Sequence, residues 1–249
     1  MLEAANLHDA RERAASGRAL LEGPHLLEEA LAAGVGVERI FALEGDEASA
    51  RAAGRCGADL VLVDERGLRR LATTEHPQSP VAVMVVPPEG PAPAGDLLVA
   101  WGVGDPGNVG SLIRSAAAFD LGFAAGPGTA DPWAPKVLRS ASGGHFRAGA
   151  FRARSLEDLR RGGRRLVATV ARGGLPPSAL PGADLAILVG DEARGLPEEV
   201  VAACDLAVSI SMPGGVESLN AAVAGAILAY EAARRRATPG GAMGARRAP

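Results

Sequence analysis

The stretch from Pro87 to Gly95 contains four prolines and two glycines within nine residues. Proline lacks the backbone N–H that helices and central strands require, so neither can run through such a stretch. This composition is typical of a stiff, extended linker, and a chain of 249 residues is long enough for one or two domains. The prediction is a first domain, a linker, a second domain and a disordered tail, at residues 1–86, 87–96, 97–236 and 237–249.

Both predicted domains alternate short apolar runs with helical patterns, which is typical of α/β folds. In the first domain the apolar runs lie at residues 40–43, 60–63 and 81–86, and they predict a small, mainly parallel sheet. In the second domain we expect buried strands at 97–101, 122–126, 166–170, 185–189 and 206–210, and helices at 109–119 and 219–235. The last helix is apolar or small on every side as far as Tyr230, which predicts that its first part is buried.

Composition excludes several classes of protein. No apolar run reaches the ~18 residues of a membrane span, and the N-terminus shows no secretory signal. Two cysteines and four scattered histidines favour neither a disulfide framework nor a metal site, so we expect a reducing, cytoplasmic setting. A net charge of −3 argues against a surface that is basic throughout, but it allows a local phosphate-binding patch. With 3% aromatic residues, stacking of many bases is not expected.

A strand-to-helix turn from Asp105 to Arg114 carries the first candidate site. Asn108 suits the N-cap of the helix, and Gly107, Gly110 and Arg114 fall on nearly one face. The two glycines leave that face bare, so the backbone of another chain can approach the arginine closely, and an arginine near helix-start amides is suited to bind a phosphate. A capped surface helix with an exposed arginine is the alternative interpretation.

The same region contains Gly102, Gly104 and Gly107 in the spacing of the dinucleotide-binding fingerprint. That fingerprint expects an acidic residue at the end of the next strand, and residues 122–126 end without one. A proline within the loop also disagrees with the fingerprint. An NAD-dependent oxidoreductase is therefore an alternative that the sequence does not favour.

Two further strands end in glycine-rich turns, one from Gly190 to Gly195 and one after Ile210. Ser218 can cap the last helix, and Asn220 is a polar group that needs a partner, for which we favour a ligand. The carboxyl ends of parallel strands meet at one edge of a sheet, so the three turns predict one pocket built from backbone amides and carbonyls.

Together the three turns resemble the motifs of the SpoU (TrmH-type) family of RNA ribose 2′-O-methyltransferases. The matching motifs, in the family's order, are Asn108-x-Gly110-x-x-x-Arg114, Gly190-x-Glu192-x-x-Gly195-Leu196, and Met212-Pro213 through Ser218-Leu219-Asn220. The first domain, in which Leu20-Leu21-Glu22-Gly23 leads into a helix, resembles the L30e-like RNA-binding domain of many members.

The resemblance implies an α/β SPOUT-type domain with a parallel sheet and a deep trefoil knot, preceded by the small L30e-like α/β domain. It implies S-adenosyl-L-methionine as cofactor, S-adenosyl-L-homocysteine as product, no metal, and a homodimer through the knotted domain. The implied cofactor-binding residues are Thr169, Val170, Ala171, Leu188, Val189, Gly190, Glu192, Gly195, Ile210, Met212, Leu219 and Asn220.

In the same way, Arg114 corresponds to the family's catalytic arginine, accompanied in the site by Asn108, Glu192, Ser218 and Asn220. A ribose 2′-hydroxyl must lose its proton as it attacks, and in the family an RNA phosphate at the arginine is proposed to assist. Arginine is a difficult base because its pKa exceeds ~12. Arg114 is therefore expected to be essential, and two roles stay open for it: the base itself, or a group that fixes a phosphate so that the hydroxyl points at the methyl group.

The predicted function is methyl transfer from S-adenosylmethionine to a ribose 2′-oxygen in RNA. Ribosomal RNA, in particular 23S, is favoured over tRNA because the first domain resembles that branch of the family. A non-catalytic RNA-binding factor with the same fold is the alternative outside the enzyme class. Predicted RNA contacts are Arg11, Arg13, Arg18, Arg114, Arg139 and Arg147.

Overall fold

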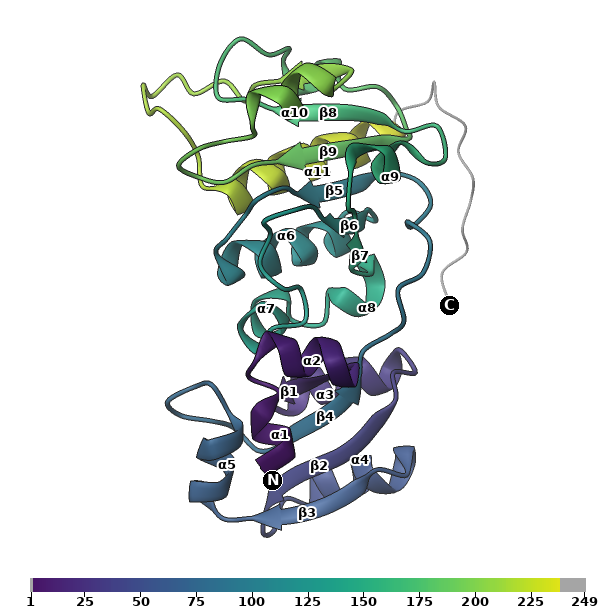
Figure 1. Ribbon diagram of the computed structural model, residues 1–249, viewed down its shortest axis with the longest axis vertical. Helices are drawn as coiled ribbons and strands as arrows, with labels where there is room; N and C mark the ends of the chain where they lie inside the picture. Colours follow the sequence, from purple (N-terminus) through teal and green to yellow (C-terminus); the bar gives the residue numbers. More distant parts are fainter. Residues whose placement is uncertain (1, 238–249) are drawn as a thin grey trace.

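The computed structural model describes residues 2–237, which form two sheets arranged along the long axis of the molecule (Figure 1). The strands of the N-terminal sheet are β1 (Arg18–Glu22), β2 (Val37–Leu43), β3 (Asp59–Val63) and β4 (Val81–Val85). The helices of this part are α1 (Leu2–Asn6), α2 (Ala10–Ser16), α3 (Pro24–Ala32), α4 (Glu47–Cys56) and α5 (Glu65–Leu71).

The N-terminal sheet is mixed, so the prediction of a mainly parallel sheet is wrong. The strand order is β1-β4-β2-β3, in which β4 runs antiparallel to both β1 and β2, and only β2 and β3 are parallel. Helix α4 connects the parallel strands β2 and β3 in a β-α-β crossover, as expected for a parallel pair. The chain after α5 instead returns in the opposite direction and inserts β4 between β1 and β2, which the apolar runs alone do not distinguish.

The second sheet is entirely parallel, as predicted. Its strands, in the spatial order β10-β8-β9-β5-β6-β7, are β5 (Leu97–Ala100), β6 (Gly122–Ala125), β7 (Phe151–Arg152), β8 (Arg165–Thr169), β9 (Leu185–Val189) and β10 (Leu206–Val208). The helices are α6 (Pro106–Ala118), α7 (Pro135–Ala141), α8 (His145–Ala148), α9 (Leu156–Arg160), α10 (Glu198–Ala203) and α11 (Ala221–Ala237), with a short 3-10 helix at Pro177–Ala179.

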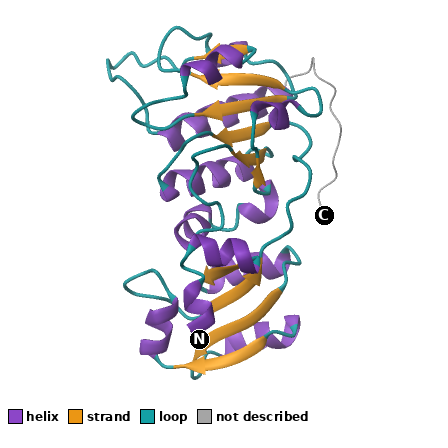
Figure 2. Ribbon diagram, viewed as in Figure 1, coloured by secondary structure: helices purple, strands orange, loops and turns teal. Residues whose placement is uncertain are grey.

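Helices cover both faces of the parallel sheet (Figure 2). Alternate strand residues such as Leu98 and Ile187 pack with α6 and α11, whereas Leu97 and Leu188 pack on the other face with α9 and α10. Strands buried on both faces explain the continuous apolar runs in the sequence. This arrangement leaves the carboxyl ends of the strands for a binding site.

Helix α6 starts earlier than predicted because Asp105, rather than Asn108, is its N-cap. The Asp105 carboxylate accepts a hydrogen bond from the backbone N–H of Asn108 at 2.9 Å. Pro106 occupies the first helical position, where its fixed φ favours a helix start. This backbone hydrogen bond, opposed by partial burial and aided by the nearby Lys136, lowers the pKa of Asp105. The side chain of Asn108 is consequently available for contacts outside the helix.

Helix α11 also differs from its prediction. Asn220, rather than Ser218, caps it, because Asn220 Oδ1 accepts hydrogen bonds from the backbone N–H groups of Ala222 at 3.0 Å and Val223 at 3.2 Å. The first part of α11 is buried on one side only, since Val223 and Ile227 remain exposed. The prediction that its first part is buried is therefore correct for one side of the helix and wrong for the other.

The segment predicted as a linker contains no helix or strand, and its end is packed against the second sheet. Arg164 Nε donates to the carbonyl of Gly95 at 2.7 Å, and Asp96 is buried and paired with Arg236 at 3.1 Å. Of the predicted tail, Ala237 ends α11, and residues 238–249 lie outside the described residues. No helix within residues 2–237 is long and apolar enough to cross a membrane.

Candidate active site

A cavity of about 450 Å³ lies beyond the carboxyl ends of β8, β9 and β10. Its walls come from three segments that follow these strands, together with α10 and the start of α11. The lining residues are Thr169, Val170, Ala171, Val189, Gly190, Asp191, Glu192, Ala193, Arg194, Gly195, Leu196, Val201, Ile210, Met212, Glu217, Ser218, Leu219, Ala221 and Ala224. The second and third glycine-rich turns therefore line one pocket, whereas no residue of the first turn lines it, so the prediction of one pocket from three turns is confirmed for two of them.

The turn after β9 closes on itself through its backbone. Gly195 N–H donates to the carbonyl of Asp191 at 2.8 Å, and Asp191 Oδ1 accepts from the N–H of Ala193 and of Arg194 at 3.0 and 3.1 Å. At Gly190 a Cβ atom would lie 2.3 Å from the carbonyl carbon of Gly195 and 2.4 Å from the nitrogen of Leu196. Only glycine fits this close approach of two backbone segments.

Three polar side chains, one from each motif turn, meet in a hydrogen-bonded chain. Asn220 Nδ2 donates to Asn108 Oδ1 at 2.9 Å, and Asn108 Nδ2 donates to Glu192 Oε1. Glu192 lines the cavity, while Asn108 comes from the start of α6 and Asn220 caps α11. Asn220 therefore has protein partners in Asn108 and in the backbone N–H groups of Ala222 and Val223, and its contact with a ligand stays a prediction. The first turn joins the other two through Asn108.

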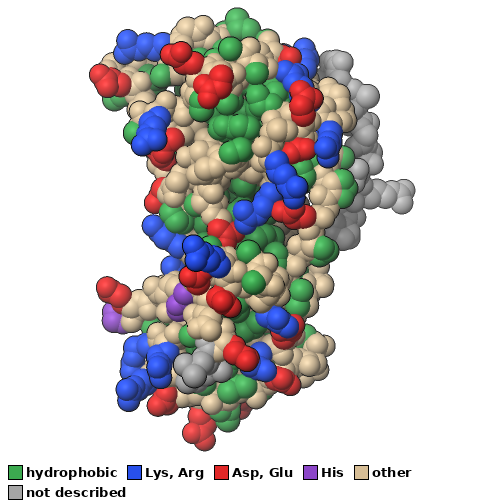
Figure 3. Space-filling view, in the orientation of Figure 1, with side chains coloured by type: hydrophobic (Ala, Val, Ile, Leu, Met, Phe, Trp, Pro, Cys, Tyr) green, Lys and Arg blue, Asp and Glu red, His purple; other side chains and the backbone are tan. Residues whose placement is uncertain are grey.

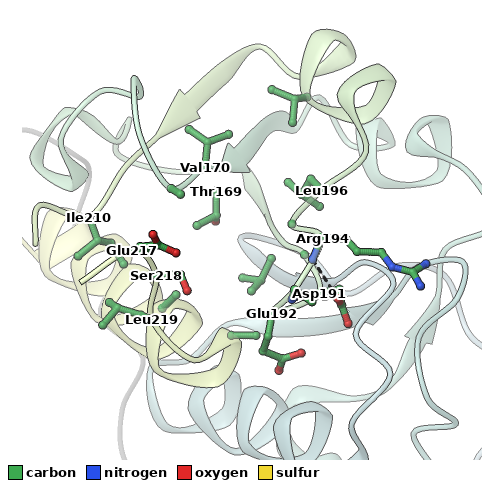
Figure 4. A pocket seen from close by; sticks show the side chains of 18 of the residues that line it. Thr169, Val170, Asp191, Glu192, Arg194, Leu196, Ile210, Glu217, Ser218 and Leu219 are labelled. Atoms are coloured by element: carbon green, nitrogen blue, oxygen red, sulfur yellow. Dashed lines mark hydrogen bonds between the residues drawn. The ribbon is translucent and has the colours of Figure 1, made fainter. Parts of the chain in front are cut away.

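The close view shows how these side chains are directed (Figure 4). Glu217 and Ser218 point into the cavity from the third turn, opposite Thr169 and Val170. Arg194 points away from the cavity. Thr169 Oγ1 is buried and has no hydrogen-bond partner within the described residues. The site thus combines apolar walls with a few polar groups, as small-molecule pockets do.

Arg114 lies outside this cavity. It is six positions after Asn108 on α6, about 9 Å along the helix axis, and its side chain is exposed. Within residues 2–237 it forms no ion pair. The helix face that was predicted to be bare is covered by α7 and α8 of the same chain. A Cβ atom added at Gly110 would lie 2.5 Å from the Cβ of Ser140 in α7. A Cβ atom added at Gly144, the residue before α8, would lie 3.1 Å from the Cα of Arg114.

Most of the predicted cofactor-binding residues line the cavity. The exceptions are Leu188, which is buried in the core, and Asn220, which stands at its edge in the hydrogen-bonded chain. Eight lining residues are absent from the predicted site: Asp191, Ala193, Arg194, Leu196, Val201, Glu217, Ala221 and Ala224. Those at 191–196 and at 217 lie within the motif turns, so their place in the turns could have indicated them, whereas Val201 comes from α10 and the two alanines from α11.

The other predicted RNA contacts differ in burial and in their partners. Arg13 is buried, forms an ion pair with Asp131 at 2.6 Å and donates to two backbone carbonyls, so its prediction as an RNA contact is wrong. Arg11 is exposed on the same helix and stays a prediction. The other three pair with carboxylates while remaining partly exposed: Arg18 with Glu38 at 2.5 Å, Arg139 with Glu22 at 2.9 Å and Arg147 with Glu29 at 3.5 Å.

A profile of the SpoU rRNA methylase family matches residues 96–230. This chain belongs to that family. A second profile, of the MRM3-like substrate-binding domain, matches residues 2–82. The family predicted from the three motifs is therefore confirmed, and with it the interpretation of the chain as a methyltransferase. None of the residues from Gly102 to Gly107 lines the cavity, which removes support from the dinucleotide alternative.

Relatives and solved structures match along nearly the whole chain. The 23S rRNA (guanosine(2553)-2′-O)-methyltransferase RlmP of Bacillus subtilis is 36% identical over 230 residues, covering 90% of this chain and 92% of that protein. The SpoU methyltransferase AviRb of Streptomyces viridochromogenes, solved in complex with AdoMet, has a TM-score of 0.85 at 26% identity and covers 95% of this chain and 97% of its own. A TrmH-family chain from Porphyromonas gingivalis has a TM-score of 0.83 at 30% identity, with 94% and 96% covered.

Within the SpoU family fold, the parallel sheet and the preceding substrate-binding domain agree with the predictions. The trefoil knot and the L30e-like character of the first domain stay predictions.

Proposed function

We propose that this chain transfers the methyl group of S-adenosylmethionine to a ribose 2′-oxygen, and that its substrate is 23S ribosomal RNA. The observation that carries the proposal is the hydrogen-bonded chain Glu192–Asn108–Asn220, which joins the three motif turns at the edge of one cavity. Side chains held by one another in this way keep a single orientation. Such order suits a site that must align two reactants.

The lining of the cavity fits S-adenosylmethionine. A volume of about 450 Å³ is within the range of ~300–1,000 Å³ for small-molecule sites. Val170, Ile210 and Leu219 offer apolar walls for a flat base, and the carboxylate of Glu217 favours a cationic sulfonium. When bound, S-adenosylmethionine supplies an electrophilic methyl group. The AdoMet complex of AviRb, at 26% identity, supports this assignment.

Arg114 is the residue that we assign to RNA. Its exposed guanidinium has no ion pair within the described residues, so it can bind a phosphate through two parallel hydrogen bonds. Arginine keeps its proton at neutral pH, and its role is therefore to hold the phosphate beside the target ribose. As the bond from the methyl carbon to the 2′-oxygen forms and the carbon–sulfur bond breaks, the hydroxyl proton passes to an oxygen of that phosphate.

A second copy of the chain completes the site in this proposal. Arg114 does not line the cavity of its own chain. Val223, Ile227 and Tyr230 form an exposed apolar stripe on α11, at the spacing of one helix face. We propose that this stripe is the homodimer contact, that the knotted fold underlies it, and that RNA meets residues of both subunits. An Ile227→Glu variant is expected to be monomeric by light scattering and to bind RNA without transferring methyl groups.

The choice of 23S RNA rests on similarity to RlmP, whose name specifies a 23S guanosine, and on the match of residues 2–82 to a substrate-binding domain. The test is methyl transfer from labelled S-adenosylmethionine to unmodified 23S RNA and to unmodified tRNA in parallel. Label in the 23S RNA alone, lost in Arg114→Ala with cofactor affinity unchanged, is the expected result. Label in tRNA alone would assign the enzyme to the other substrate, and unchanged transfer by Arg114→Ala would remove the role of the arginine.

A further inference from the structure

Helix α5 presents an unusual concentration of positive charge. Three of its seven residues are arginines, and Arg66, Arg69 and Arg70 are all exposed. They lie three and four positions apart, which places them on neighbouring parts of one side of the helix. Arg69 pairs with Glu65 at 3.1 Å, whereas neither Arg66 nor Arg70 forms an ion pair with any residue of 2–237. Two unpaired like charges at this spacing repel each other, and a polyanion bound across them would relieve the repulsion.

The fold of α5 does not depend on these arginines. Asp64 caps the helix by accepting from the N–H of Gly67 at 2.7 Å, and Leu68 and Leu71 anchor its inner side in the core. On the outer side Arg69 pairs with Glu65, whereas no ion pair within the described residues accounts for Arg66 and Arg70. A surface of this kind is the footprint expected of a phosphate-binding site.

The end of α5 is fastened to the methyltransferase part of the chain. Thr73, two residues beyond the helix, donates to Glu22 Oε1 through its backbone N–H at 2.9 Å and through its hydroxyl at 2.8 Å. Arg139 of α7 donates to the same hydroxyl and pairs with Glu22 at 2.9 Å. The Glu22 side chain is almost fully buried, so this cluster holds α5 and α7 at a fixed separation.

Helix α7 in turn lies against the helix of the first motif. Lys136 of α7 is 3.5 Å from the carboxylate of Asp105, the N-cap of α6, and the backbone of α7 packs directly on Gly110. The space-filling view shows basic side chains over the region of α5 and again over that of α7, on the same side of the molecule (Figure 3). The α5 surface thus stands at a set distance from the helix that carries Arg114.

We propose that Arg66 and Arg70 bind the phosphate backbone of the substrate RNA at a point remote from the methylated nucleotide. This assignment rests on the proposed function for the identity of the RNA. Contacts of this kind carry no base information, but they fix the register of a nucleic acid on a protein. Because α5 is held rigidly relative to α6, a phosphate bound there determines which nucleotide can reach Arg114.

The test compares two double variants that remove the same charge from the same part of the chain. Arg66→Gln/Arg70→Gln changes the proposed surface, and Arg51→Gln/Arg55→Gln removes two exposed, carboxylate-paired arginines of α4. The dissociation constant of a 23S RNA transcript is measured over a series of salt concentrations. Each phosphate contact contributes about one unit to the slope of log K against log salt.

For the α5 variant we expect a slope shallower by about two and affinity about ten-fold weaker at moderate salt. The KM for RNA should rise while the affinity for S-adenosylmethionine stays unchanged, and Arg66→Lys/Arg70→Lys should restore most of the RNA affinity. The α4 variant should bind RNA as the wild type does. Equal slopes for the α5 variant and the wild type, or equal losses in both double variants, would overturn the proposal.

Binding and catalysis are measured separately, so the two proposals can fail independently. A wild-type protein that binds RNA through α5 but transfers no methyl group would contradict the proposed function and retain the α5 surface. A wild-type protein that methylates 23S RNA with an unchanged slope in the α5 variant would do the reverse. Thermal unfolding of each variant identifies any loss of binding that comes from loss of folding.

Discussion

The side-chain amide of Asn220 donates to Asn108 Oδ1 at 2.9 Å, joining positions 112 residues apart in the chain. The same Asn220 caps α11 through its oxygen, while the amide of Asn108 reaches Glu192 at the cavity. A single asparagine therefore sets both the start of α11 and the orientation of the first motif. Mutation of Asn220 can separate the role of its amide nitrogen, the donor to Asn108, from that of its amide oxygen, the cap of α11.

Asn220→Asp should keep the cap and lose the donor to Asn108. We expect nearly wild-type stability and a rate of methyl transfer at least about ten-fold lower, since one hydrogen bond in such a network contributes about 1–3 kcal/mol. Asn220→Ala should lose the same rate and also about 1 kcal/mol of stability, because the cap is removed. Initial rates and urea unfolding measure the two effects. A wild-type rate in Asn220→Asp would contradict the role of the hydrogen-bonded chain.

Gly190→Ala should abolish or greatly weaken cofactor binding, because the added Cβ would overlap the backbone at Gly195. Gly214→Ala in the third turn is the matched control, since a Cβ there meets no atom within 4 Å. Calorimetric titration with S-adenosylmethionine is expected to give an affinity at least about ten-fold weaker for the first variant and an unchanged one for the second. Equal affinities of the two variants would show that the close approach of Gly190 to the backbone at Gly195 is not needed for cofactor binding.

The outcome at these turns shows what the sequence could predict. Gly190, Gly195 and their strand were placed at the pocket because backbone approach after a buried strand requires glycine, which is a local rule. The caps were assigned to the wrong residues, since Asn and Ser satisfy the same local rule as the Asp105 and Asn220 that act as caps. Pro106 directly after Asp105 was the signal that could have identified the first of them.

Arg13→Met tests whether this arginine is structural. The variant leaves Asp131 with Arg152 as its remaining partner, and we expect a loss of about 2–3 kcal/mol in the free energy of unfolding. Arg11→Met, on the exposed side of the same helix, should change stability by less than about 0.5 kcal/mol. Denaturant unfolding of both variants makes the comparison. If Arg13→Met were as stable as wild type and bound RNA more weakly, the original RNA assignment would stand after all.

His145 should make the protein less stable in mild acid. Burial lowers its pKa to about 4, against the hydrogen bond from its ring to the carbonyl of Pro132 and the charge of Asp131. Between pH 4 and 6.5 the unfolded chain binds more protons at this residue than the folded one, so stability falls as the pH falls through that window.

Between pH 7 and pH 5 this single group should cost about 2 kcal/mol of unfolding free energy. His145→Gln should reduce the difference between the two pH values by that amount, whereas His76→Gln, on an exposed loop, should leave it unchanged. Urea unfolding at the two pH values is the measurement. The same pH dependence in wild type and His145→Gln would mean that another group is responsible.

The arginines mark the boundary of sequence-based prediction. Arg13 and Arg139 look like surface cations because their partners, Asp131 and Glu22, lie more than a hundred positions away. Only the packing of the N-terminal part against α7 and the segment before it brings these charges together. The orientation of β4 was missed for the same reason, since strand pairing depends on contacts that no short window contains.

The position of the transferred methyl group tests the central claim most directly. Wild-type protein is incubated with labelled S-adenosylmethionine and unmodified 23S RNA, and the RNA is then hydrolysed in alkali, which cannot cleave next to a methylated 2′-oxygen. The account predicts that the label appears in alkali-resistant dinucleotides and disappears in Arg114→Ala. Label released in mononucleotides, as a methylated base would give, or no label despite bound cofactor, would contradict it.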